Sequence, residues 1–328
     1  MEQNQIDQQI IKKDVTSRKG LFIFLGFVIV ALVIGIMKLF TMCTQGTRSF
    51  SSDEYIAVVY IEGIIEPIND SYDHQWAIDT IYSLSTDPDN KGILLYIDSP
   101  GGAVYQSDEL YLELMEYKAE TDRPIFAYLG PQATSGGYYI ACAADYIYAN
   151  RNSITGSIGV ISGQSVDLSK FLETHGIKIN TFYAGKNKVM LGIDTPVTPE
   201  QEEIMQKIAD ECYQQFTGIV AESRQLPLEQ VIELSDGRIY TAQQALENGL
   251  IDEISRFSHV ETTLSEEYGA ELFYLYPEIE KSFYDYLLGA FSNNKKPESI
   301  NTLDSILEIT GSNIPFPAFM YQEGIVIP

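Results

Sequence analysis

ATSGGYY, residues Ala133–Tyr139, directly follows an apolar run of strand composition, Ile125–Leu129. Residues 136–144 favour a helix, so the stretch predicts a strand-to-helix turn with Ser135 at its apex. A turn of this kind can present a hydroxyl group and a free backbone N–H to the same point. Acyl transfer needs this geometry, because its nucleophile must lie beside a donor for the developing oxyanion.

A second glycine-rich turn, DSPGG at Asp98–Gly102, follows another apolar run, Gly92–Ile97. From Tyr55 onward, apolar runs alternate with helical patterns, which is typical of a mostly parallel sheet covered by helices on both faces. Ligand sites in such α/β sheets lie at the carboxyl ends of the strands. The two turns are therefore expected to converge.

The remaining pattern predicts further elements of both kinds. Expected strands are 146–149, 158–161 and 178–183, and expected helices are 76–84, 104–117 and 199–224. The last of these helices has a proline near its first turn and glutamates where the helix dipole favours anions.

Composition limits the classes of function. The chain has 328 residues, is 45% apolar and carries a formal net charge of −25. A surface this acidic argues against nucleic acid as a partner, because phosphate contacts need Lys and Arg. The three cysteines, Cys43, Cys142 and Cys212, have spacings typical of neither a disulfide framework nor a zinc site. Neither a metal nor another cofactor is expected.

The N-terminal region predicts a membrane anchor at 21–42. Residues 21–37 carry no charge, and with the apolar residues just beyond Lys38 the segment can span about 30 Å of hydrocarbon as a helix. Four basic residues precede it, which favours a cytoplasmic N-terminus and an extracytoplasmic catalytic domain at the cell membrane. A cleaved signal peptide is the alternative, but the apolar region is long and no A-x-A-like site follows. The expected organisation is a cytoplasmic terminus (1–20), the anchor, a stalk (43–54), a catalytic domain (55–256) and a C-terminal extension (257–328).

A serine nucleophile needs a base, and the histidines are poor candidates. The chain has three, His74, His175 and His259, and none lies in 136–174, just after the serine. Each is expected at the surface or at a helix cap. A Ser-His-Asp triad is therefore poorly supported.

Lysine can replace histidine if burial lowers its pKa from about 10.4 towards 7. Lys186 and Lys188 follow the expected strand 178–183, and Lys188 precedes an apolar run, so it is expected to enter the drier environment. Ser157 offers a hydroxyl that can orient an ammonium group.

Five motifs in order resemble the signal peptide peptidase A family (protease IV-like). They are DSPGG at 98–102, TSGGYY at 134–139, ITGSIGV at 154–160, GKNK at 185–188 and DGRIYTAQQALENGLID at 236–252. The match runs from about Tyr55 to Ile254. The resemblance implies a Clp-protease/crotonase-like α/β domain, a Ser–Lys dyad and rings in which neighbouring subunits complete each site.

By matching position, the resemblance implies Ser135 as the nucleophile and Lys188 as the general base. Ser157 matches the hydroxyl that hydrogen-bonds the lysine, and the N–H groups of Gly101 and Gly136 match the oxyanion donors. Two departures stand out: Asp98 replaces a frequent Asn, which adds an anion near the site, and one residue is added around 162–165.

The sequence thus predicts a membrane-anchored serine endopeptidase that degrades cleaved signal peptides and other short or unfolded peptides. Two alternatives remain open. A crotonase-like acyl-CoA enzyme would use the paired N–H groups without Ser135 or Lys188, and a catalytically inactive assembly module would form rings without peptide turnover.

Overall fold

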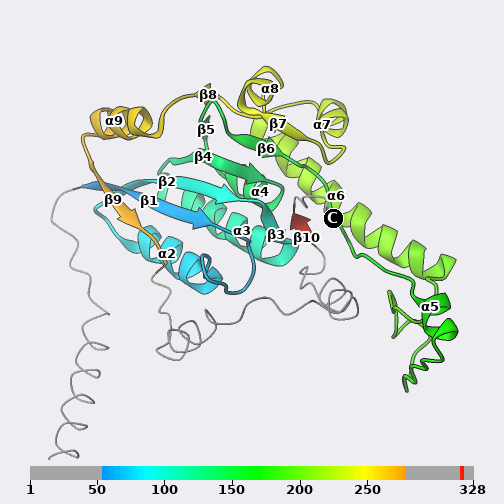
Figure 1. The fold of residues 1–328 in the computed structure, drawn as a ribbon. Helices are drawn as coiled ribbons and strands as arrows, with labels where there is room; N and C mark the ends of the chain where they lie inside the picture. The colour runs from blue at the N-terminus through cyan, green and yellow to red at the C-terminus, as the bar shows by residue number, and fades with distance from the viewer. Residues whose placement is uncertain (1–53, 278–317, 321–328) are drawn as a thin grey trace, which may run out of the picture. The chain divides into compact units, whose positions relative to one another are not determined.

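The computed structural model describes residues 54–277 and the backbone of residues 318–320 (Figure 1). The expected cytoplasmic terminus, the anchor at 21–42 and almost all of the stalk lie outside these residues. Among these residues, no helix is both long enough and apolar enough to cross a bilayer.

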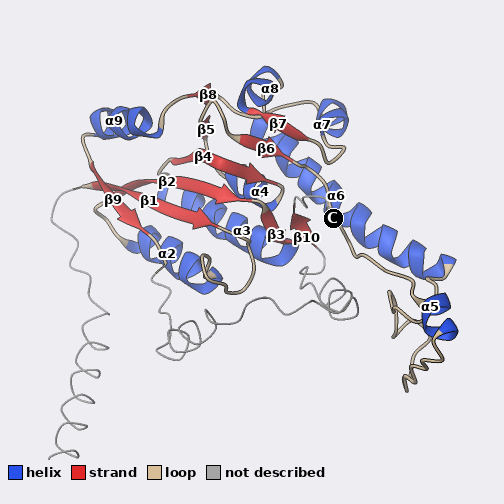
Figure 2. Ribbon diagram, viewed as in Figure 1, coloured by secondary structure: helices blue, strands red, loops and turns tan. Residues whose placement is uncertain are grey.

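Eight strands form one sheet (Figures 1 and 2). They are β1 (Tyr55–Glu62), β2 (Asn90–Ser99), β4 (Ile125–Thr134), β5 (Tyr146–Ala149), β6 (Ile154–Gly156), β7 (Ile239–Thr241), β8 (Glu253–Ile254) and β9 (Glu271–Leu275). The main order is β7-β6-β4-β2-β1-β9, with β5 between β4 and β8. Every pair is parallel except β6–β7. This is the mixed α/β fold that the alternating pattern predicts.

β1 illustrates why these runs become interior strands. Its sequence YIAVVYIE is buried at every residue except Tyr60 and Glu62 near its carboxyl end. A strand covered on both faces cannot alternate apolar with polar residues, so it appears in the sequence as a continuous apolar run. The structure also contains a strand that the sequence pattern does not predict, β9, which pairs with β1 in parallel.

Helices α2 (His74–Thr86), α3 (Val104–Thr121) and α4 (Gly136–Ala141) pack together on one side of the sheet (Figure 2). The long helix α6 (Pro199–Arg224) has the bounds expected from the sequence. Thr198 and Gln201 form a capping box at its start, so two backbone N–H groups that lack helical partners are satisfied.

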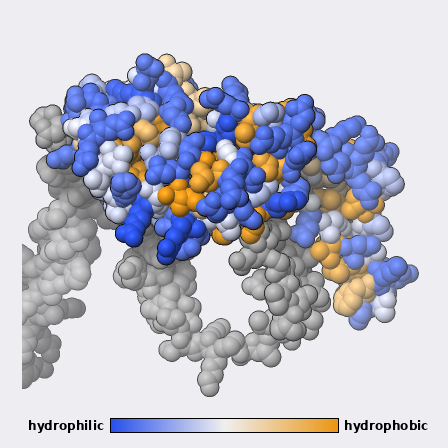
Figure 3. All heavy atoms as spheres, turned by 90° about the horizontal axis from the view of Figure 1, so that it is seen from above, coloured by the Kyte–Doolittle hydropathy of each residue, from blue (hydrophilic) through white to orange (hydrophobic). Residues whose placement is uncertain are grey.

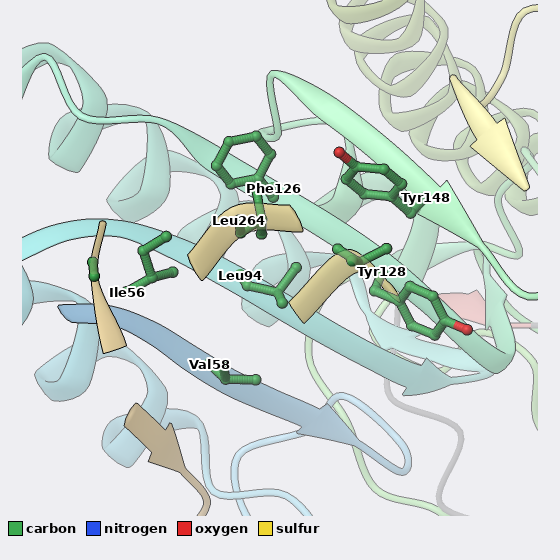
Figure 4. Close-up of a cluster of buried hydrophobic side chains, with 9 residues drawn as sticks. Ile56, Val58, Leu94, Phe126, Tyr128, Tyr148 and Leu264 are labelled. Carbon is green, nitrogen blue, oxygen red and sulfur yellow. The ribbon is translucent and has the colours of Figure 1, made fainter. Parts of the chain in front are cut away.

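The opposite face of the sheet is covered by α9 (Phe257–Tyr268). Val260 and Leu264 of this helix pack in one cluster with Ile56, Val58 and Leu94 of the sheet (Figure 4). The segment after 256, which the sequence suggests is an extension, thus contributes both a helix and β9 to the same core. Burial of apolar area at this interface stabilises the fold.

The sheet forks at β4. Along one edge β4 pairs with β2, and along the other it pairs first with β5 and then with β6. The change of partner occurs at Gly130 and Pro131, which pair with neither β5 nor β6. Pro131 cannot donate a backbone hydrogen bond, which suits a position between two partners. The second half of β4 leads directly into Ser135.

Two expected strands are wrong. Residues 158–161 and 178–183 lie outside every named strand of the described chain. Residues 178–183 belong to an arm, residues 162–198, that projects from the sheet and contains the short helix α5 (Ser169–Thr174) (Figures 1 and 2). A strand needs a partner, and this segment pairs with none of the strands in the described residues. The remaining helices are α7 (Leu228–Leu234) and α8 (Ala242–Glu247).

Candidate active site

Ser135 occupies the turn between β4 and α4, with φ 55° and ψ −116°. This combination lies outside the left-handed helical region, so it is strained for a residue with a side chain. The side chain is 1% exposed, and its Oγ atom has no hydrogen-bond partner among the described residues. Buried hydroxyl groups normally have a partner, so a strained serine without one is a candidate for chemistry.

The two glycine-rich turns meet, as the sequence predicts. A Cβ atom placed on Gly136 would lie 2.5 Å from Ser107 Oγ, 3.2 Å from the Gly102 nitrogen and 3.3 Å from the Gly101 Cα. Only glycine fits at this contact. The first turn of α4 is therefore pressed against the chain that enters α3, and backbone N–H groups from both turns can face the Ser135 side chain.

The backbone N–H groups of the glycine-rich turn at 98–102 have different partners. Gly101 donates its N–H to Ser99 Oγ at 3.0 Å, and Ser99 Oγ donates to the Gly63 carbonyl at 2.6 Å. The Gly102 nitrogen faces Gly136. Gly102 pairs with Phe319 of the short strand β10 (Ala318–Met320), so its N–H lies on that edge. The Gly101 hydrogen bond to Ser99 is a side-chain contact that the sequence does not reveal.

Ser157 lies close to Ser135 through the end of β6. The Ser135 N–H donates to the Gly156 carbonyl at 2.8 Å, and Ser157 follows in the left-handed region at φ 52°. Ser157 donates its N–H to the Arg238 carbonyl at 2.8 Å and is 7% exposed. The structure thus brings together four of the five predicted residues: Ser135, Ser157, Gly101 and Gly136.

Lys188, the fifth predicted residue, lies on the projecting arm and is exposed. In the described part of the chain its ammonium group makes no ion pair and no contact with Ser135 or Ser157. Lys186 differs, because it forms an ion pair with Glu200, and Asn187 also donates to Glu200 at 3.0 Å. Of these two lysines, Lys186 is thus engaged locally, whereas Lys188 has no ion-pair partner among the described residues.

In the described residues, none of the three histidines makes a hydrogen bond to the Ser135 hydroxyl group. His175 caps α5, with Nδ1 2.8 Å from the Phe171 carbonyl, and His259 is exposed on α9. His74 is buried, so the expectation of a surface or capping position is wrong for it. Its Nδ1 is 3.0 Å from Tyr72 Oη, and its Nε2 is 2.7 Å from Glu109 Oε2. This hydrogen-bonded network joins α2 to α3.

Asp98 points away from the serine. Successive side chains of a strand alternate between faces, and Ser99 is the one that holds the turn. The Asp98 carboxylate accepts the Gln132 N–H at 3.2 Å and lies opposite Glu62 on β1. Burial, and then the charge of Asp98, raise the pKa of Glu62. The added anion therefore acts on the α9 face of the sheet.

The glycine-rich turn at 98–102 leads into a short strand, β3 (Gly101–Ala103). The backbone of β10 (Ala318–Met320) pairs with it in antiparallel register, with Phe319 opposite Gly102. On its other side, Ile65 donates to the Gly101 carbonyl at 2.9 Å and accepts from Ala103 at 2.7 Å. β3 is therefore an edge that accepts an extended segment from the end of the chain. Nothing in the sequence pattern indicated this pairing.

Comparison with known proteins gives the family. The Peptidase family S49 model matches residues 118–271, and the Clp protease model matches residues 52–170. A signal peptide peptidase SppA of Enterococcus faecium is 34% identical over 231 residues, or 67% of each chain. The chain belongs to the signal peptide peptidase A family. Family membership and the Clp-protease match support a serine peptidase with a Clp-protease-like fold.

The chain is also similar to other proteins. A Methanocaldococcus jannaschii protein described as a protease is 33% identical over 243 residues, which are 70% of this chain and 76% of that relative. A mutant of the 1510-N membrane-bound stomatin-specific protease, solved with a substrate peptide, has a TM-score of 0.43 and 17% identity. The alignment covers 74% of this chain and all of the other chain. No group of three or more potential metal ligands occurs in residues 54–277.

Proposed function

We propose that this chain is a membrane-anchored serine endopeptidase that uses Ser135 as nucleophile and Lys188 as general base. The observation that carries the proposal is the strained, buried Ser135, whose Oγ lacks a partner beside the first turn of α4. An unpaired hydroxyl at that point has no structural purpose. It would serve as a nucleophile as soon as a base accepts its proton.

The reaction follows from these groups. The Lys188 amine takes the proton from Ser135 Oγ, which attacks a peptide carbonyl carbon and forms a tetrahedral oxyanion. The N–H of Gly136, together with a backbone N–H of the turn that holds the predicted donor Gly101, stabilises that oxyanion. The lysine then gives its proton to the leaving amine. Water, activated by the same amine, releases the acyl group and restores the serine.

Peptides as substrates are supported by β3. An extended peptide can bind by adding a strand to a free sheet edge, where main-chain hydrogen bonds give affinity without a fixed sequence. β10 of the chain itself pairs with this edge beside Gly102. A substrate in the same position would have its carbonyl groups close to the turn that holds Ser135.

A homo-oligomeric ring with shared sites is supported by the arm. Lys188 is exposed there and makes no hydrogen bond to Ser135 in the described chain, which supports a dyad that is completed by a neighbouring subunit. The arm also exposes apolar side chains, among them Phe182 at 96%, Tyr183 at 58% and Ile177 at 45%, and hydrophobic residues lie on its surface (Figure 3). Such a surface is typical of an interface. A neighbouring copy would receive Lys188 beside its own Ser135 and Ser157.

The anchor at 21–42 supports the substrate class and the location. Signal peptides that remain in the bilayer after cleavage are apolar, and an extracytoplasmic domain tethered at the cell membrane lies near them. The relative in Enterococcus faecium is named for this activity. We therefore propose cleaved signal peptides, with other short or unfolded peptides, as the substrates.

A crotonase-like acyl-CoA enzyme and an inactive assembly module fit less well. Neither requires a strained serine with an unpaired buried hydroxyl group. The test is labelling of the full-length protein in detergent with a fluorophosphonate, alongside cleavage of an apolar fluorogenic peptide. Wild type is expected to be labelled on Ser135 and to cleave, and Ser135→Ala is expected to do neither while keeping its thermal stability. Undiminished cleavage by Ser135→Ala would refute the mechanism.

A further inference from the structure

A cavity lies on the face of the sheet opposite to α4. It has a volume of about 610 Å³ and is walled by the rings of Tyr96, Tyr128 and Phe257. Tyr96 and Tyr128 stack with centroids 5.8 Å apart, and Phe257 lies 5.0 Å from Tyr96 and 4.9 Å from Tyr128. Gly130 and Pro131, where β4 changes partner, also line it. We name this cavity, with these five residues, the tyrosine pocket.

The aromatic wall continues beyond the pocket. Tyr60, Tyr96 and Tyr128 occupy the same register on β1, β2 and β4, so they form one row across three strands. Tyr60 lies 4.9 Å from Tyr96 and 5.0 Å from Tyr276 in ring centroids. Aromatic faces carry partial negative charge, so a row of them attracts a cation.

Carboxylates surround the row without a cation among them. Glu62 and Asp98 face each other one step further along the same strand face, and Glu261 lines the pocket. Only part of their capacity is used: Asp98 accepts the Gln132 N–H, and Glu261 accepts the Tyr274 hydroxyl at 2.7 Å. Within residues 54–277, no Lys or Arg pairs with any of the three carboxylates. The surface offers carboxylate acceptors and aromatic faces, and no lysine or arginine is among the residues that line the pocket.

We propose that the tyrosine pocket binds a basic side chain of the peptide substrate, with arginine favoured over lysine. A guanidinium group supplies five N–H donors in one plane and stacks on aromatic rings, which matches both the carboxylates and the tyrosines. This specificity site rests on the proposed peptidase function. It adds a preference that Ser135 and its neighbours do not encode.

The pocket and the nucleophile share one strand, which sets the spacing. Pro131 and Ser135 are four residues apart, or about 13 Å at the rise of a β-strand. An extended peptide bound at Ser135 therefore reaches the pocket with a residue at least about four positions from the scissile bond. The basic residue and the cleaved bond lie on opposite faces of the sheet, joined across its carboxyl edge.

The experiment uses the full-length protein in detergent and a set of fluorogenic peptides with one apolar cleavage segment. One arginine is moved stepwise from two to eight residues away, and each peptide has a glutamine twin. Wild type is expected to give a KM about tenfold lower for the arginine peptide at a spacing of four or more, with kcat unchanged. Glu261→Gln and Tyr96→Leu are expected to remove most of that difference while leaving the glutamine peptides unaffected.

Glu229→Gln is the matched control, because it removes one exposed carboxylate from α7, away from the pocket. It is expected to keep the arginine preference. Equal KM values for both twins at every spacing would overturn the pocket proposal, even with rapid cleavage. Binding is measured separately on Ser135→Ala by fluorescence anisotropy of the labelled peptides. A retained arginine preference in that variant, with cleavage absent from wild type, would refute the peptidase function and leave the pocket standing.

Discussion

The Ser135 N–H donates to the Gly156 carbonyl at 2.8 Å, and this bond fixes the strained turn to the end of β6. Gly156 has φ 82°, and a Cβ atom there would lie 2.5 Å from Tyr240 Cδ2. Gly156, which accepts the hydrogen bond from Ser135, is thus itself held by the contact of β6 with β7. The position of Ser135 depends on residues distant in sequence, and Ser157 follows in the same short segment.

Lys186 and Lys188 of the arm are expected to differ. Lys188→Ala should lower kcat by about 10³-fold, because a general base contributes roughly 10²–10⁴. Lys186→Ala should change kcat less than about twofold, since an exposed ion pair such as that with Glu200 contributes little. Steady-state cleavage of one apolar peptide measures both. The reverse ranking would make Lys186 the base.

Complementation tests the shared site. Ser135→Ala and Lys188→Ala are each expected to be inactive, but rings mixed in equal amounts should recover about a quarter of wild-type activity. That fraction corresponds to sites whose serine comes from one variant and whose lysine comes from the other. Differently tagged subunits, purified in tandem, establish that the rings are mixed. Mixed rings without any activity would place both residues in one chain.

Gly136 tests the contact between the two turns. Gly136→Ala should abolish activity and lower the free energy of unfolding by about 2 kcal/mol, because a Cβ atom would collide with Ser107 Oγ. Gly218→Ala is the matched control, since nothing lies within 4 Å of its Cβ position on α6. It should raise the free energy of unfolding by about 0.5–1 kcal/mol and leave activity intact. Chemical denaturation and peptide cleavage provide the two readouts.

Removal of β10 should free the β3 edge. A chain ending before Ala318 is expected to cleave short peptides with a kcat/KM raised about threefold or more, because a tethered segment competes at high effective concentration. A chain in which 318–320 become Gly-Ser-Gly at the original length controls for tail length. Unchanged or reduced kcat/KM in both chains would mean that substrates bind without this edge.

The thiol of Cys142 should be inert. Burial raises its pKa to about 12 from an ordinary 9.0, so it stays protonated near pH 8 in the folded protein. Its contribution to stability is complete below about pH 9 and is lost as pH rises, because only the unfolded chain then ionises it. Iodoacetamide at pH 8, followed by peptide mapping, should modify Cys142 in denaturant only. Modification of the native protein at the denatured rate would contradict its burial.

Much of the fold around Ser135 could be predicted from the sequence. Apolar runs and glycine-rich turns are local signals, so the strands before both turns and the whole of α6 were placed correctly. Residues 178–183 have strand composition, but strand formation depends on a partner that composition does not encode. The same reason hid β10, whose partner lies far away along the chain.

The candidate site divides in the same way. Ser135, Gly136 and Ser157 belong to motifs that the turns and β6 bring together. The N–H of Gly101, the other predicted donor, makes a hydrogen bond to Ser99 Oγ that motif spacing does not reveal. Burial of His74 similarly depends on its contacts with Tyr72 and Glu109, which arise only when α2 packs on α3.

The order in which the chain is made gives the Gly156 contact a protective consequence. A ribosome adds residues from the N-terminus, so Ser135 is synthesised before both Gly156 and the arm that carries Lys188. Until β6 docks, the Gly156 carbonyl is not in place to hold Ser135 in its strained conformation. If the proposed dyad is completed by a neighbouring subunit, the nascent chain is inactive while its own unfolded segments, and those of other growing proteins, are close by.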